Sequence, residues 1–191
     1  MQEQHPSFKL HIHEQPTETL LSNLYTGQID AAVIALPYPQ QNLDIIPFAE
    51  ERFYVVANKQ HPIAQQNSVK PNQLRQTNLL LLEEGHCLSE QIIDLCKIEP
   101  QFNKQYFNEA SLSTLFQLAV NNMGVTLMPA ISLESIAHYQ QINTIALNVP
   151  SPHRQLAIVT RNHYPRRDEL LHLAKLFAQS LANQQGVNPL L

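Results

Sequence analysis

Short apolar runs alternate along the chain with segments that carry an apolar residue every three or four positions, and this alternation constrains the fold most. The runs predict strands and the periodic segments predict helices. Residues 29–36, apolar at nearly every position, are typical of a parallel strand covered on both faces. The pattern therefore predicts an α/β fold with mostly parallel sheets. The predicted strands are 8–14, 29–36, 43–47, 52–57, 79–82, 104–108, 125–128, 142–149 and 155–160; the predicted helices are 17–26, 88–98, 111–123, 131–138 and 167–182; residues 184–191 are expected to fray.

Two polar connections that contain proline, at 71–77 and 148–153, enclose the middle of the chain. A middle block between two such connections predicts two Rossmann-like lobes. We expect the first lobe to take residues 1–76 and 154–191, and the second lobe to take residues 77–150. Ligands of such folds bind between the lobes, at the carboxyl ends of the strands.

The composition excludes several classes of function. The chain has 191 residues, 43% of them apolar, and a net charge of −4 at pH 7. Lys and Arg are scattered apart from Arg166 and Arg167, so nothing resembles a nucleic-acid-binding surface. We see no apolar run of membrane-spanning length and no signal peptide, and therefore expect a cytoplasmic protein without a membrane partner. His11 and His13 have no third ligand at a recognisable spacing, so we interpret them as surface or strand-face residues and not as a metal site.

Of the two cysteines of the chain, Cys87 lies just before the predicted helix 88–98 and Cys96 lies within it. Cys87 follows the apolar run 79–82 and precedes a helical stripe, so it lies where a strand turns into a helix, next to His86. The amide groups and positive end of a helix stabilise a thiolate, and a neighbouring imidazole adds to this. Cys96 comes nine residues later, which is about 13 Å along a helix and on its opposite face.

That separation has a chemical consequence for the two thiols. A disulfide requires Cα atoms within about 7 Å, so the two cysteines can pair only if the helix unwinds. In a reducing cytosol such a pair is usually transient or sensing, and the arrangement has the layout of a redox switch. The alternative is two buried cysteines that act as small apolar residues. Position alone does not decide between these readings for Cys87.

The segment EGHCL at 84–88, with a second cysteine nine residues after the first, resembles the peroxide-sensing segment of the OxyR subfamily of LysR-type transcriptional regulators. Residues 27–34 (GQIDAAVI) and 123–129 (MGVTLMP) resemble segments shared by the wider LysR family. The resemblance implies a type II effector domain that is similar to periplasmic binding proteins. It also implies a transcriptional activator that senses hydrogen peroxide, without a cofactor and without enzymatic turnover.

The resemblance also assigns roles to residues. It implies that Cys87 is oxidised by peroxide to sulfenic acid and that Cys96 resolves it into a reversible Cys87–Cys96 disulfide. It implies peroxide contacts for His86 and for Thr17, which follows a Glu14-x-x-Thr17 turn. We expect Thr17 and Cys87 to face one another across the cleft, although an ordinary helix N-cap is the simpler reading of Thr17. The implied partners are a second copy in a dimer or tetramer, DNA bound through a helix-turn-helix domain that this chain lacks, and thiol reductants such as glutaredoxin.

The chain departs from that subfamily in three respects. Ser89 stands where relatives often carry arginine, which removes one source of thiolate stabilisation. The helix-turn-helix is absent, and the chain begins after the family's first strand and helix, so we expect a fragment. Two other functions stay open. One is a LysR effector domain that binds a small metabolite, with incidental cysteines, and the other is a catalytic thiol peroxidase. No Gly-rich phosphate loop or other enzyme motif is present.

Overall fold

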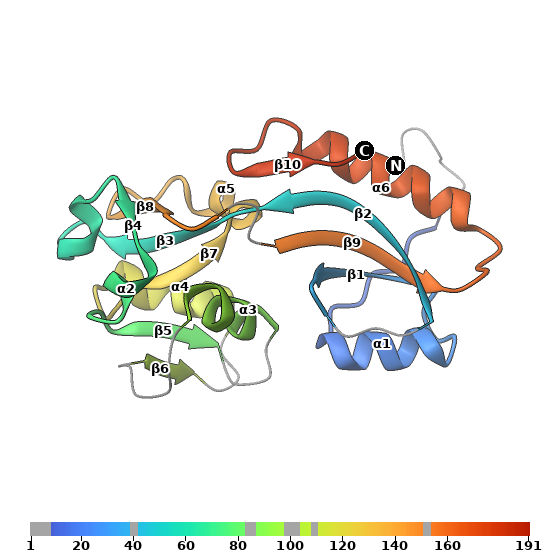
Figure 1. Ribbon diagram of the computed structural model, residues 1–191, viewed down its shortest axis with the longest axis horizontal. Helices are drawn as coiled ribbons and strands as arrows, with labels where there is room; N and C mark the ends of the chain where they lie inside the picture. The colour runs from blue at the N-terminus through green and yellow to red at the C-terminus, as the bar shows by residue number, and fades with distance from the viewer. Residues whose placement is uncertain (1–8, 39–41, 83–86, 98–103, 108–110, 151–153) are drawn as a thin grey trace. The chain divides into compact units, whose positions relative to one another are not determined.

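The structure is a computed structural model that describes residues 9–38, 42–82, 87–97, 104–107, 111–150 and 154–191 (Figure 1). Its contacts divide the chain into two compact units. Unit 1 consists of Met1–Glu50, Arg154–Asn183 and Val187–Leu191, and unit 2 of Glu51–His153 and Gln184–Gly186. The chain therefore has the α/β class that the alternating pattern predicted, and it forms two units, as the two polar connections predicted.

Unit 1 is a four-stranded sheet with a helix on each face. The sheet order is β1 (Ala31–Leu36), β9 (Arg154–Arg161), β2 (Leu43–Glu51) and β10 (Val187–Pro189), and the helices are α1 (Thr17–Tyr25) and α6 (Arg167–Leu181). Successive side chains of a strand point to opposite faces of the sheet. On β9, Leu156 and Ile158 pack with Ala174 and Ala178 of α6, whereas Val159 packs with α1. The two helices accordingly lie on opposite sides of the sheet (Figure 1).

Unit 2 contains a second sheet and a smaller parallel pair of strands. The sheet order is β4 (Ser68–Val69), β8 (Ile142–Leu147), β3 (Phe53–Asn58) and β7 (Thr126–Pro129), and the pair is β5 (Leu79–Leu82) with β6 (Lys104–Phe107). A parallel bridge from Leu79 to Val125 joins β5 to the segment that enters β7. The helical elements are the 3-10 turns Pro62–Gln65 and Ala130–Ser132, and the helices α2 (Pro71–Leu74), α3 (Cys87–Cys96), α4 (Leu112–Val120) and α5 (Leu133–Ile136).

Strand β5 is buried on both faces, which explains its unbroken run of leucines. Leu79 and Leu81 belong to the core cluster that includes Ile92 and Cys96 of α3. Leu80 and Leu82 pack instead with Leu115 of α4. The alternation places α3 and α4 on opposite faces of β5. The strand is therefore the support against which the cysteine-bearing helix packs.

The pairing of the strands is more mixed than the predicted mostly parallel sheets. β1 pairs with β9 antiparallel, and β3 pairs antiparallel with both β7 and β8. The parallel pairs are β4 with β8 and β5 with β6. β1 is the terminal strand of its sheet as described, and its Val33 is 51% exposed. The prediction of a parallel strand is therefore wrong for 29–36, and the face that carries Val33 is covered only in part, at Ala31 and Ala35.

Several predicted boundaries also differ from the structure. The described part of 8–14 is not a strand, and its alternating residues Leu10 and Ile12 are exposed. Residues 51–76, expected in the first lobe, lie in unit 2 because β3 pairs with β7 and β8 there. The C-terminal segment, expected to fray, contains β10, and the Leu190 amide donates to the Phe48 carbonyl at 2.9 Å.

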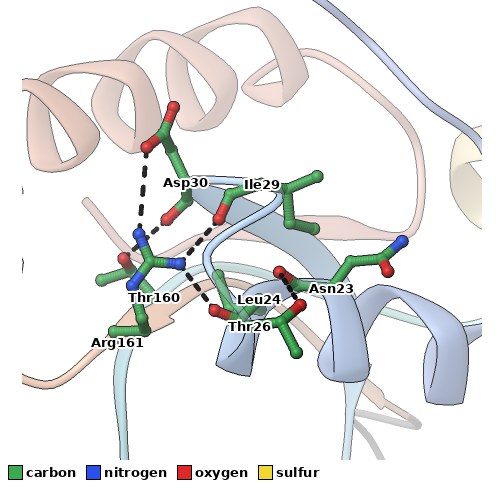
Figure 2. Close-up of polar contacts among 7 residues, drawn as sticks. All are labelled: Asn23, Leu24, Thr26, Ile29, Asp30, Thr160 and Arg161. Carbon is green, nitrogen blue, oxygen red and sulfur yellow. Dashed lines mark hydrogen bonds and ion pairs between the residues drawn. The ribbon is translucent and has the colours of Figure 1, made fainter.

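Arg161, at the end of β9, fixes the turn between α1 and β1 (Figure 2). Its Nη1 donates to the carbonyl of Leu24 at 2.6 Å and to that of Ile29 at 2.7 Å. Leu24 lies in the last turn of α1, where carbonyls lack partners within the helix and a cation is favourable. Gly27, with φ +76°, reverses the chain between the two carbonyls.

Replacing Arg161 with lysine is expected to lower the free energy of unfolding by about 1–3 kcal/mol, because the planar guanidinium bonds both carbonyls through Nη1 while its Nη2 lies 3.9 Å from Asp30 Oδ1, a geometry that one ammonium does not reproduce. Urea denaturation followed by circular dichroism measures the change. Arg166→Lys is the matched control, since the Arg166–Glu169 pair is solvent-exposed and the substitution should leave the urea midpoint nearly unchanged. Equal midpoints for the two variants would contradict the role assigned to Arg161.

Candidate functional site

Cys87 is the first residue of α3 and is partly buried. β5 ends at Leu82, and residues 83–86, which include His86, lie outside the described residues. The predicted strand-to-helix context of Cys87 is therefore confirmed, whereas the role of His86 stays a prediction. The first amide groups of a helix lack carbonyl partners within it and favour negative charge nearby.

Cys96 is the last residue of α3 and is 2% exposed. Its side chain lies in the core cluster with Leu79, Leu81 and Val125. Burial raises the pKa of the Cys96 thiol to about 12. The folded protein therefore holds Cys96 as a protonated thiol, which is a poor nucleophile.

One continuous helix separates the two thiols. α3 runs from Cys87 to Cys96, and neither cysteine is in a disulfide. Nine residues of helix correspond to about 13 Å along the axis, well beyond the ~7 Å that a disulfide allows between Cα atoms. The predicted helix is confirmed through Cys96. The two sulfurs can meet only after part of α3 unwinds.

Ser89 is buried in the first turn of the same helix, and the sequence did not predict its role as a hydrogen-bond donor. It is 1% exposed, and its Oγ donates to the carbonyl of Leu82 at 3.0 Å. The bond ties the first turn of α3 to the end of β5. Ser89, Ile92 and Cys96 are the buried residues of the helix, at positions i, i+3 and i+7. That spacing was the available signal that Ser89 faces the core.

The other end of α3 has a weaker contact. Lys97 follows the helix with φ +48°, and its carbonyl accepts a hydrogen bond from Arg75 Nη2 at 3.3 Å. A cation at the C-terminus of a helix is favourable, but this contact is solvent-exposed. The N-terminal bond of Ser89 is therefore the better shielded of the two.

Thr17 is the first residue of α1 in unit 1 and is partly buried. The prediction that it is the N-cap is off by one residue, because Pro16 occupies that position and no side chain caps the helix. Thr17 and Cys87 belong to different units, and their proximity stays a prediction.

His11 and His13, which the sequence did not favour as a metal site, are exposed at the surface in an irregular segment and not on a strand. The described residues contain no group of three His, Cys, Asp or Glu side chains that could hold a metal ion. Across the same residues, no helix is both long and apolar enough to cross a membrane.

The chain passes between the two α/β units four times, after residues 50, 153, 183 and 186, and two such units are typical of an effector domain of the binding-protein type. The chain belongs to the LysR substrate binding domain family, whose sequence model matches residues 1–184.

Two curated relatives and one solved structure show which members of the family this chain resembles. The chain is 33% identical over 186 residues to a probable hydrogen peroxide-inducible genes activator of Mycobacterium avium, covering 97% of this chain and 60% of that protein. It is 34% identical over 169 residues to the HTH-type transcriptional regulator EstR of Acinetobacter baylyi, covering 86% and 54%. A cysteine-to-serine mutant of Corynebacterium glutamicum OxyR, solved with hydrogen peroxide bound, superposes with a TM-score of 0.80 at 31% identity, covering 94% of this chain and 61% of that one.

These comparisons support the resemblance seen in the sequence, with relatives that are transcriptional regulators and not enzymes. The chain spans about half to three fifths of the length of the two curated relatives.

Proposed function

We propose that this chain is the regulatory domain of an OxyR-like, LysR-type transcriptional activator that senses hydrogen peroxide through Cys87 and Cys96. The observation that carries the proposal is the thiol pair at the two ends of α3, one partly buried at the helix start and the other in the core. The peroxide-inducible activator and the peroxide-bound OxyR structure among the relatives support it.

The proposed chemistry balances without a cofactor. The Cys87 thiolate attacks one oxygen of hydrogen peroxide, the O–O bond breaks, and hydroxide leaves and is protonated to water. Cys87 becomes a sulfenic acid. The Cys96 sulfur then displaces the second hydroxyl as water, forming the disulfide. Two thiols lose two electrons in total, and one peroxide is reduced to two waters.

The order of events follows from burial. Cys96 is protonated and enclosed while α3 is intact, so peroxide oxidises Cys87 first. Opening of the helix then exposes Cys96 to the sulfenic acid. Refolding of the segment from 87 to about 100 changes the surface of unit 2 and, through it, the contact between copies in a homodimer or tetramer.

The remaining roles complete the proposal. Thr17 and His86 hydrogen-bond the peroxide and stabilise the departing hydroxide. A helix-turn-helix domain in the whole protein binds DNA, and cytoplasmic thiol reductants such as glutaredoxin restore the dithiol. The protein acts once per oxidation event and does not turn over peroxide as a thiol peroxidase would.

Micromolar peroxide is expected to convert the parent chain to a Cys87–Cys96 disulfide, measured by thiol-specific mass spectrometry. In Cys96→Ser a dimedone adduct of sulfenic acid should form at Cys87, because the resolving thiol is missing. In the matched Cys87→Ser variant, Cys96 should stay a thiol, because burial protects it. An oxidised Cys96 in Cys87→Ser, or no intramolecular disulfide in the parent, would refute the proposal. Sustained peroxide consumption with a thiol reductant would favour the peroxidase instead.

A second function is favoured by one observation, the 34% identity to EstR, which is named as a transcriptional regulator without reference to peroxide. In that case the cleft binds a small metabolite and the cysteines are incidental. A thermal melt with a panel of small carboxylates separates the two. A raised melting temperature with a carboxylate, and none with peroxide, would favour the metabolite.

A further inference from the structure

We propose that Ser89 is the positioning residue that holds the Cys87 turn on β5, and that its hydrogen bond to Leu82 sets the balance between the dithiol and the disulfide. The inference rests on the proposed function and adds a residue that sets the midpoint potential of the thiol pair. In this role, Ser89 does not contact the sulfur of Cys87 or of Cys96. It acts through the position of the first turn of α3.

The bond is well placed to hold that turn. The Ser89 hydroxyl is two residues from Cys87 and lies within the first turn of the helix. It donates at 3.0 Å to the last carbonyl of β5, and both Ser89 and Leu82 are buried, at 1% and 7% exposed. A buried carbonyl that loses its hydrogen-bond donor has no water to take the donor's place, and this costs free energy. The bond therefore opposes any movement of the Cys87 turn away from β5.

The disulfide requires such a movement at one end of α3. The Cα atoms must approach from about 13 Å to within about 7 Å. The second half of the helix is fixed by Ile92 and Cys96, each 2% exposed and packed in the main core of unit 2. Cys87 is only partly buried. The first turn is therefore the part that leaves first, and the Ser89–Leu82 bond is broken in the disulfide form.

A contact present in the dithiol and absent from the disulfide has a defined effect on the redox equilibrium. It stabilises the reduced form and so makes the disulfide more oxidising. In glutathione buffer, the disulfide and two glutathione thiols give two protein thiols and one glutathione disulfide. Removing the Ser89 hydroxyl is expected to raise the ratio of disulfide to dithiol about fivefold at a fixed glutathione ratio, which lowers the midpoint potential by about 20 mV.

The matched control is Thr126→Val. Thr126 Oγ1 donates to the carbonyl of Leu80 at 3.1 Å, so it also makes a buried bond to β5, but it comes from β7, which does not carry a thiol. Both substitutions remove one buried hydroxyl bond to the same strand. Only Ser89→Ala should shift the potential, and Thr126→Val should leave the ratio within about twofold. Ser89→Thr keeps the donor and should restore the parent ratio.

The experiment equilibrates the 191-residue parent chain, the three variants and Arg75→Gln in a series of glutathione ratios, and quantifies disulfide by mass spectrometry after acid quench. An unchanged ratio in Ser89→Ala, or the same shift in Thr126→Val, would overturn the inference. A shifted disulfide-to-dithiol ratio in Arg75→Gln, with an unchanged ratio in Ser89→Ala, would also overturn it, because the C-terminal end of α3 would then be the end that is released. A parent chain that forms no Cys87–Cys96 disulfide overturns the proposed function together with this inference, whereas a parent that forms it, with Ser89→Ala unchanged, overturns this inference alone.

Discussion

Iodoacetamide at pH 8 is expected to alkylate Cys96 about a thousandfold more slowly in the folded, reduced chain than in the chain unfolded in urea. The thiolate is the form that reacts. Burial raises the pKa of Cys96 from 9.0 to about 12, which lowers the thiolate fraction at pH 8 by about three orders of magnitude. The Cys87→Ser variant leaves Cys96 as the one thiol of the chain, so mass spectrometry of the intact protein measures its rate directly.

The dependence of the Cys96 alkylation rate on pH tests the direction of the pKa shift. A raised pKa keeps Cys96 protonated, so its alkylation rate in the folded protein should rise about tenfold per pH unit from 7 to 9 with no plateau. In urea the rate should begin to level off near pH 9. A folded-state rate close to the unfolded one would mean that α3 opens often without oxidation. Cys96 would then be available before Cys87 is oxidised, and the proposed order of events would fail.

The cysteine-bearing part of the fold was predictable because its signals are local. The leucine run 79–82 and the apolar spacing after it are properties of adjacent residues, and they predicted both β5 and α3. The start of the predicted helix 111–123 is local for the same reason, and Ser111, the N-cap of α4, accepts a hydrogen bond at Oγ from the Thr114 amide. In each case the evidence lies within one turn or one strand.

The strand pairing was not predictable, because it depends on residues far apart in the sequence. The register of β1 on β9 joins Ala31 to Thr160, and no local pattern encodes that partner. The alternation of Leu10 and Ile12 predicted a strand, yet both side chains are exposed, because an apolar pattern alone does not supply a neighbour to pair with.

The lobe boundary was misplaced for a related reason. β2 and β3 are separated by Arg52 alone, so the crossing between units has no loop composition to mark it. The polar segment at 71–77 gave a stronger loop signal and lies inside unit 2. Ser89 was noticed as a departure from a family pattern, but its use as a donor depends on the distance to Leu82, which only the structure supplies.

Gly124 shows how a correctly noticed residue can have a different physical role. Gly124 directly follows the predicted helix 111–123, where a glycine commonly ends a helix, but the C-cap of α4 is Asn121 and the left-handed residue after it is Asn122, with φ +58°. Gly124 is instead the point where β5 approaches the segment leading into β7. The Val125 amide donates to the Asn78 carbonyl at 2.9 Å, and the Leu80 amide donates to the Val125 carbonyl at 2.8 Å.

Gly124→Ala is expected to lower the free energy of unfolding by about 2–4 kcal/mol, combining overpacking with strain on two backbone hydrogen bonds. A Cβ at Gly124 would lie 2.4 Å from the Asn78 carbonyl oxygen and 2.8 Å from Leu80 Cδ2. A backbone oxygen cannot turn aside, so β5 must move away from Val125. That movement would also disturb α3, because Cys96 packs on Leu79 and Ser89 bonds Leu82. Urea denaturation measures the loss.

Gly27→Ala separates this crowding from the general cost of adding a methyl group to a glycine. Its nearest neighbour would be Arg161 Nη1 at 3.9 Å, so only the left-handed backbone, at φ +76°, opposes the alanine, and the expected cost is about 1–2 kcal/mol. If Gly124→Ala cost no more than Gly27→Ala, β5 would have room to shift freely. The helix that carries both thiols would then rest on a movable strand, and Ser89 could not hold the Cys87 turn against it.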